Sequence, residues 1–124
     1  MALVLVVEDD PLIASFIRKA LGREGYDVEW VPTGKAALER VAAGGVDLQL
    51  LDLGLPDIDG LDVLRSLQER GERIPVIVIT SRSDPVDRAT AEGLGVDAYL
   101  MKPFPLATLL SVVSATLSRR VSPD

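Results

Sequence analysis

A short apolar segment that ends abruptly at a carboxylate lies near the middle of this 124-residue chain. The segment Asp47–Leu51 is apolar from Leu48 onward except for Gln49, and Asp52 follows it directly. Such a run is typical of a strand that is covered on both faces, as in a parallel α/β sheet. Ligands of these sheets bind beyond the carboxyl ends of the strands, so Asp52 stands where a functional residue is expected.

The same pattern recurs along the chain, because short apolar segments alternate with amphipathic ones. Strands are expected at Leu3–Val7, Val28–Val31, Asp47–Leu51, Val76–Ile79 and Ala98–Met101. Helices are expected from Pro11 to about Gly22, from Thr33 or Gly34 to Gly44, from Leu61 to near Gly71, from Pro85 to Gly93, and from Leu106 to about Arg119. This alternation predicts an α/β fold with a single doubly wound, five-stranded parallel sheet and helices on both faces. The flavodoxin-like strand order 2-1-3-4-5 is the expected arrangement.

More specific expectations concern two of the helices and one tryptophan. The first helix is expected to turn one apolar face inward, made of Ile13, Phe16, Ile17, Ala20 and Leu21. The fourth helix is expected to be weak, because its apolar face is mostly alanine and glycines bracket its end. Trp30 lies on a predicted edge strand and is interpreted as a packing residue with no role at a functional site.

Composition excludes several classes of function. The chain has neither cysteine nor histidine, which excludes disulfides, thiolate metal sites and the commonest general base. Its formal net charge of −6 argues against direct binding to nucleic acid or to an anionic membrane surface. No apolar run reaches membrane-spanning length, and the amino terminus lacks the pattern of a secretory leader. A cytoplasmic protein is therefore expected.

Four of the predicted strands end at polar residues of different chemistry. The first ends at Glu8 and Asp9, the third at Asp52, the fourth at Thr80 and the fifth at Lys102. In the expected order, the first and third strands are neighbours about 4.8 Å apart, so their carboxylates converge. Crowded acids repel unless a cation neutralises them, and oxygen ligands without histidine or cysteine favour Mg²⁺.

These residue types suit phosphoryl transfer. A carboxylate beside Mg²⁺ can act as a nucleophile and form an aspartyl-phosphate, which is the role that fits Asp52. Lys102 lies two strands away, roughly 10 Å, and its long side chain can reach in to neutralise phosphoryl charge. Thr80, on the strand between them, is placed to donate a hydrogen bond to a phosphoryl oxygen.

Four segments, in this order and spacing, make the chain resemble the receiver domains of two-component response regulators. They are Val6–Asp10, Leu51–Gly60, Ile79–Ser81 and Tyr99–Phe104. The resemblance extends from Leu3 to about Leu117 and is greatest to the receivers of transcriptional regulators that carry a winged-helix DNA-binding domain. It implies a receiver domain over residues 1–119, followed by a tail or the start of a linker over residues 120–124.

The resemblance also implies roles for the acidic residues. Asp52 would be the phosphoacceptor and would share Mg²⁺ with the acids that end the first strand. Asp9 would bind the ion directly, Glu8 would act through water, and the backbone carbonyl of Gly54 would complete the protein ligands. The next acid, Asp10, is interpreted as a helix cap or as an outer-shell residue of the metal site.

A second set of residues is implied to sense the phosphoryl group. Thr80 and Tyr99 resemble a switch pair, in which the hydroxyl moves toward the phosphoryl group and the ring turns inward behind it. Lys102 would contact the phosphoryl group, and the Lys102–Pro103 peptide bond is expected to be cis.

The implied partners are a sensor histidine kinase, as phosphodonor, and an output domain or protein that contacts the fourth helix, fifth strand and fifth helix. Beyond its own phosphorylation and dephosphorylation, the domain would act as a switch and not as an enzyme. Receivers of this kind usually dimerise through charged pairs, but Val112 and Ser114 stand where arginines are typical. A monomer or a weak, phosphorylation-dependent dimer is therefore expected.

Two alternatives remain at this point. A small Mg²⁺-dependent phosphohydrolase would also use an aspartyl-phosphate, but it usually needs a second acid close after the nucleophile, where Gly54 stands. A degenerate receiver would act as an interaction module without phosphate. The intact set of Asp9, Asp52, Thr80 and Lys102 argues against it.

Overall fold

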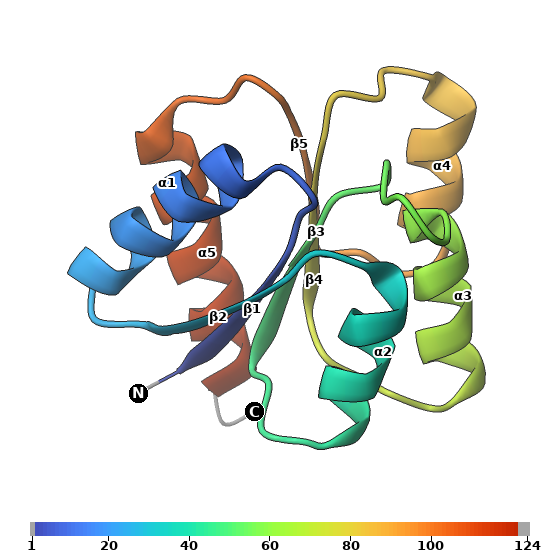
Figure 1. Cartoon of the computed structure of the whole chain (residues 1–124), viewed down its shortest axis with the longest axis horizontal. Helices are drawn as coiled ribbons and strands as arrows, with labels where there is room; N and C mark the ends of the chain where they lie inside the picture. Colours follow the sequence, from blue (N-terminus) through green and yellow to red (C-terminus); the bar gives the residue numbers. More distant parts are fainter. Residues whose placement is uncertain (1, 122–124) are drawn as a thin grey trace.

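The computed structural model describes residues 2–121 and contains one parallel sheet with five helices around it (Figure 1). The strands are β1 (Leu3–Val7), β2 (Asp27–Val31), β3 (Leu48–Leu51), β4 (Val76–Thr80) and β5 (Ala98–Met101). The helices are α1 (Pro11–Arg23), α2 (Gly34–Ala42), α3 (Gly60–Glu69), α4 (Pro85–Gly93) and α5 (Leu106–Val121). All paired strands are parallel and their order is β2-β1-β3-β4-β5, which confirms the predicted fold class.

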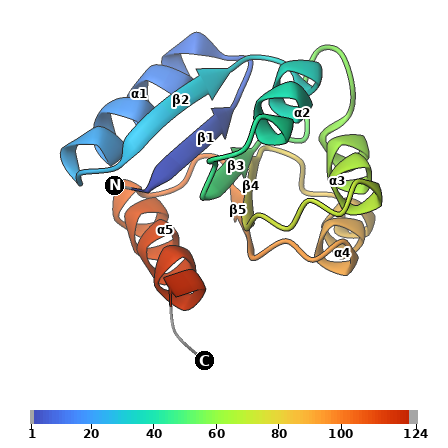
Figure 2. The same ribbon diagram turned by 90° about the horizontal axis from the view of Figure 1, so that it is seen from below.

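The helices form two layers, one on each side of the sheet. Helices α1 and α5 cover one face, and α2, α3 and α4 cover the other (Figures 1 and 2). Successive side chains of a strand point to opposite faces, so each central strand feeds both layers. Every residue of β3 and β4 is buried, as expected for strands that read as continuous apolar runs.

Helix α1 begins at the site end of the sheet. Asp10 caps it, because its carboxylate accepts hydrogen bonds from the N–H groups of Leu12 and Ile13. The buried residues of the helix are Ala14, Ile17, Ala20 and Leu21. The predicted inward position of Phe16 is wrong, since half of this residue is exposed and Ala14 is buried in the same turn. The helix is rotated so that its narrow stripe of small and branched residues faces the sheet.

Helix α4 is weakly attached, as predicted. Asp84 caps it and Pro85 is its first residue, but Ala91 is the one residue of this helix that is buried. Val86 is 69% exposed. Because apolar burial supplies most of the stability of a short helix, α4 depends on polar contacts with its neighbours.

Helix α5 extends two residues beyond its predicted end, to Val121. Residues 122–124 lie outside the described residues, so a tail or linker from residue 120 remains a prediction. Among residues 2–121, no helix is both long enough and apolar enough to cross a membrane.

Candidate functional site

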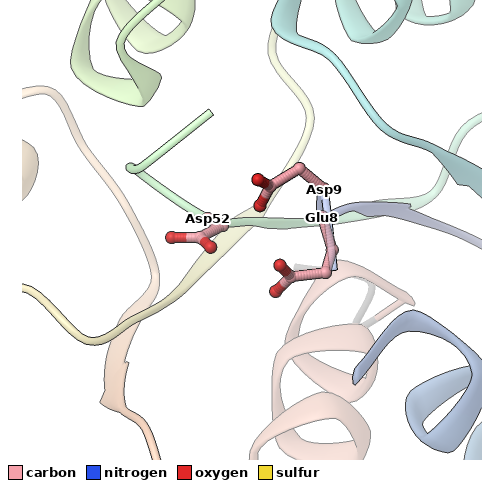
Figure 3. Close-up of side chains that lie close together, drawn as sticks. All are labelled: Glu8, Asp9 and Asp52. Carbon is pink, nitrogen blue, oxygen red and sulfur yellow. The ribbon is translucent and has the colours of Figure 1, made fainter. Parts of the chain in front are cut away.

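The carboxyl ends of β1 and β3 bring three acids together. Val7 and Leu51 are register partners, and Asp52, the first residue after β3, donates its backbone N–H to the Val7 carbonyl at 3.0 Å. Each of Glu8, Asp9 and Asp52 places a carboxylate oxygen within 4.8 Å of the others, and Figure 3 shows the three side chains gathered around one point. Glu8 is fully buried and Asp52 nearly so, whereas Asp9 is exposed.

Lys102 reaches into this cluster from the end of β5. Its Nζ donates to Glu8 Oε1 at 2.7 Å and to Asp52 Oδ2 at 2.8 Å. The other oxygen of Asp52, Oδ1, accepts from the N–H of Gly54 at 3.0 Å. The Lys102–Pro103 bond is cis, as the resemblance implied. The structure therefore brings together all four charged residues that the sequence placed at this edge of the sheet.

Burial and charge shift two pKa values in the cluster. Burial raises the pKa of Glu8, and the charge of Asp52 adds to this rise, while the hydrogen bond from Lys102 opposes it. Burial alone would lower the pKa of Lys102, but its hydrogen bonds to Asp52 and Glu8 outweigh that effect and raise it. A second positive charge would relieve the repulsion that remains between the acids.

The loop after Asp52 is packed tightly against the start of α3. Gly60 donates its N–H to the Leu53 carbonyl at 2.8 Å. A Cβ at position 60 would lie 2.6 Å from the Leu53 Cα and 2.7 Å from the Asp52 carbonyl oxygen, so only glycine fits there. In the same loop, Asp59 caps α3 and Asp57 accepts hydrogen bonds from the first two N–H groups of α2. Both acids of this loop therefore have structural partners within the protein.

Thr80 and Tyr99 both contact the backbone of a residue that the sequence analysis did not select. The buried Oγ1 of Thr80 accepts from the N–H of Arg82 at 3.2 Å. The Tyr99 hydroxyl donates to the carbonyl of the same residue at 3.1 Å. The Tyr99 ring is 8% exposed and belongs to the core beneath α4. The two residues of the expected switch pair are therefore linked through one residue, Arg82.

The guanidinium of Arg82 joins three further parts of the molecule. It forms two hydrogen bonds to Asp59, one to the Leu53 carbonyl at 3.3 Å, and an ion pair with Asp87 of α4 at 3.6 Å. Burial would raise the pKa of Asp59, but the hydrogen bond and charge of Arg82 lower it overall. Arg82 therefore connects the loop beside Asp52 to α4.

Trp30 also has a contact that its interpretation as a packing residue did not include. Its indole Nε1 donates to the backbone carbonyl of Glu8 at 2.6 Å. No sequence pattern marks this contact or the contact of Arg82 with Asp59, because the partners lie 22 and 23 positions apart.

The donor atoms of the acidic cluster suit a hard dication. All three side chains offer carboxylate oxygens, and Asp9 is open to solvent, so waters can complete a coordination sphere. The residues thus fit an ion such as Mg²⁺, which binds few protein oxygens and retains several waters.

Comparison with protein families decides the classification. Residues 4–114 match the family model described as "Response regulator receiver domain". This chain belongs to the response regulator receiver domains. The match covers the acidic cluster, Thr80, Tyr99 and Lys102, and it agrees with the strand order and with the residues at the strand ends.

Curated relatives agree with this classification. The chain is 39% identical over 121 residues to "Response regulator MprA" of Mycolicibacterium vanbaalenii, covering 98% of this chain and 52% of that protein. It is 43% identical over 119 residues to "Response regulator protein PmrA" of Pseudomonas aeruginosa, covering 96% and 53%. The chain thus spans about half the length of the curated relatives it matches.

Solved structures show the same fold. A CheY-like response regulator receiver domain protein from Methanospirillum hungatei has a TM-score of 0.92 at 28% identity, covering 97% of this chain and 96% of that one. The BeF3-activated N-terminal receiver domain of Klebsiella pneumoniae RstA has a TM-score of 0.85 at 34% identity, covering 93% and 97%. Receiver domains are therefore similar to this chain in both sequence and structure.

Proposed function

We propose that this receiver domain accepts a phosphoryl group on Asp52 from a sensor histidine kinase and thereby controls an output. The observation that supports this most directly is the position of the Asp52 carboxylate. It lies at the carboxyl edge of the sheet, within 2.8 Å of the Lys102 ammonium and beside two further acids.

Mg²⁺ would be held by Glu8, Asp9, Asp52 and the Gly54 backbone carbonyl. When bound, it neutralises the acids and the phosphoryl oxygens, so that an anionic donor can approach an anionic acceptor. The chain's own residues supply the rest. Lys102 stabilises negative charge on the phosphoryl group, and the N–H of Gly54 orients the acceptor carboxylate through its 3.0 Å hydrogen bond.

In the transfer step, a carboxylate oxygen of Asp52 forms a bond to phosphorus while the phosphorus–nitrogen bond of a phosphohistidine breaks. The electron pair of the broken bond returns to the imidazole. Water later attacks phosphorus and releases inorganic phosphate, which regenerates the carboxylate. The domain would therefore catalyse its own phosphorylation and dephosphorylation without turning over a separate substrate.

The switch would pass through Arg82. If Thr80 turned its hydroxyl toward the phosphoryl group, the N–H of Arg82 would lose its 3.2 Å acceptor. Because the carbonyl of Arg82 is held by Tyr99 and its side chain by Asp59 and Asp87, that change would reach α4 directly. The output surface would then be the α4–β5–α5 face.

The kinase would approach over the amino-terminal end of α1. Leu12 and Phe16 lie there, 81% and 50% exposed, one helical turn apart and close in sequence to the acids. The output could be DNA binding by a winged-helix domain, as in the relatives that this chain resembles. A monomer or a weak, phosphorylation-dependent dimer remains our proposal for this chain.

The experiment is intact-mass measurement after incubation with acetyl phosphate, with and without Mg²⁺. We expect the wild type to gain one phosphoryl group only when Mg²⁺ is present, and Asp52→Asn to gain none. Phosphorylation should also speed hydrogen exchange in α4. A gain of mass in Asp52→Asn would contradict the assignment of the acceptor, and steady turnover of a phosphomonoester would favour a phosphohydrolase.

A further inference from the structure

Residues of β2 hold both backbone polar groups of Glu8, its N–H and its carbonyl. Trp30 and Val31 end β2, and they are register partners of Val6 and Val7. The Glu8 N–H donates to the Val31 carbonyl at 3.1 Å, and the Glu8 carbonyl accepts from the Trp30 indole at 2.6 Å. The first of these bonds continues the strand ladder, whereas the second is made by a side chain.

The carbonyl that Trp30 contacts belongs to the peptide unit that joins Glu8 to Asp9. A peptide unit is planar, so fixing its oxygen also fixes the Asp9 nitrogen and Cα. The Glu8 carboxylate is already held by Lys102 and by the N–H of Asp10. The hydrogen bond from Trp30 therefore acts chiefly on the position of Asp9, which is the exposed member of the acidic cluster.

The ring itself is held in place from the other side. Trp30 is half-buried against the core beneath α1 and α5, and the Arg18 guanidinium of α1 lies 6.0 Å from the ring centroid. This arrangement keeps the indole N–H directed at the end of β1. A phenylalanine could keep much of the packing but could not donate the hydrogen bond.

We propose that Trp30 is a positioning residue for the acidic site, holding Asp9 where it can share a divalent cation with Glu8 and Asp52. This inference rests on the proposed binding of Mg²⁺ to those acids. Trp30, an edge-strand residue outside the cluster, would thus contribute to the affinity for the cation by holding the backbone that carries Asp9.

The test is a Mg²⁺ titration of the full chain, followed by thermal unfolding at constant ionic strength. The variants are Trp30→Phe and, as a control, Tyr26→Phe, which removes a hydroxyl from an aromatic residue just before the far end of β2. Because stabilisation by a bound ion grows as RT ln(1 + [Mg²⁺]/Kd), the rise of the unfolding temperature with Mg²⁺ gives an apparent Kd. We expect Trp30→Phe to raise this apparent Kd by about two- to tenfold, which corresponds to the loss of one hydrogen bond. Tyr26→Phe should leave the apparent Kd unchanged.

The outcomes separate the two proposals. If Trp30→Phe lowers the unfolding temperature without Mg²⁺ but leaves the apparent Kd for Mg²⁺ unchanged, Trp30 only packs and the inference is wrong. If the wild type shows no Mg²⁺ dependence, the proposed metal site fails as well. Should Trp30→Phe not fold, the emission of Trp30, the only tryptophan in the chain, provides the readout in the wild type. The emission should change with Mg²⁺ at a midpoint that equals the apparent Kd from the unfolding temperatures, and a constant emission would overturn the inference.

Discussion

The two faces of the sheet differ in how completely they are packed. Beneath α1 and α5, the inward side chains of the central strands are all apolar and buried: Val4, Val6, Leu48, Leu50, Ile77 and Ile79. On the other face the central strand β3 carries Gln49, which is fully buried. Neither the amide nitrogen nor the amide oxygen of Gln49 has a hydrogen-bond partner among the residues that the structure describes.

Among the helices, α4 is much less buried than α1 on the opposite face. Helix α1 buries four residues, whereas α4 buries Ala91 alone. Polar contacts hold α4 in place, namely the Arg82–Asp87 ion pair and the Arg88 guanidinium 5.3 Å from the centre of the Tyr99 ring. Each such contact contributes little to the free energy of unfolding, so it can be replaced by a different polar contact at a small energetic cost. The difference teaches that the face with the switch residues combines two well-buried helices, α2 and α3, with one helix, α4, that can move.

The largest expected effect on stability comes from truncating a branched side chain in α1, compared with the same kind of truncation in α4. Ile17→Ala in α1 should lower the free energy of unfolding by about 2–5 kcal/mol, because the fully buried side chain leaves a cavity. Val86→Ala in α4 should change it by less than about 0.5 kcal/mol, since Val86 is mostly exposed. Urea denaturation measures both, and similar losses would show that α4 is anchored as firmly as α1.

A smaller effect, of opposite sign, is expected at the buried amide. Gln49→Met keeps the length of the side chain and removes two polar atoms that lack partners, so it should stabilise the protein by about 1–3 kcal/mol. Gln68→Met, at an exposed position in α3, serves as the control and should change little. Chemical denaturation of the two variants decides the matter. A loss of stability in Gln49→Met would mean that the amide has hydrogen-bond partners in solution. The two faces would then not differ in unsatisfied buried polar groups.

The smallest expected effect concerns the polar attachment of α4. Arg82→Met removes the contacts to Asp59 and Asp87, and should speed hydrogen exchange in α4 by about fivefold, or about 1 kcal/mol, while α1 is unaffected. The matched control is Arg65→Met, which removes an exposed ion pair with Asp62 within α3. Equal exchange in α4 of both variants would argue that Arg82 does not hold this helix.

Much of the fold and site could be predicted from sequence because strand ends are marked locally. Asp52, Thr80 and Lys102 each follow an apolar run, and the parallel topology then brings them to one edge. Arg82 could not be found in this way, since its importance comes from contacts across 23 positions to Asp59. Phe16 was misplaced for a related reason, because the rotation of a helix is set by what packs against it and not by hydrophobicity alone.

Gly54 and Gly60 both lie in the loop that follows the acceptor residue, but they differ in the space available for a side chain. Position 60 admits no side chain, so any substitution there would clash with the backbone of the loop. At position 54 a new side chain would meet only Asp52 Oδ1, at 3.9 Å, which is an ordinary contact. Of these two glycines, therefore, only the one at position 54 can be replaced without a steric clash. A single substitution at that position could change how water reaches the phosphoryl group, and hence how long a signal lasts, without disturbing the scaffold.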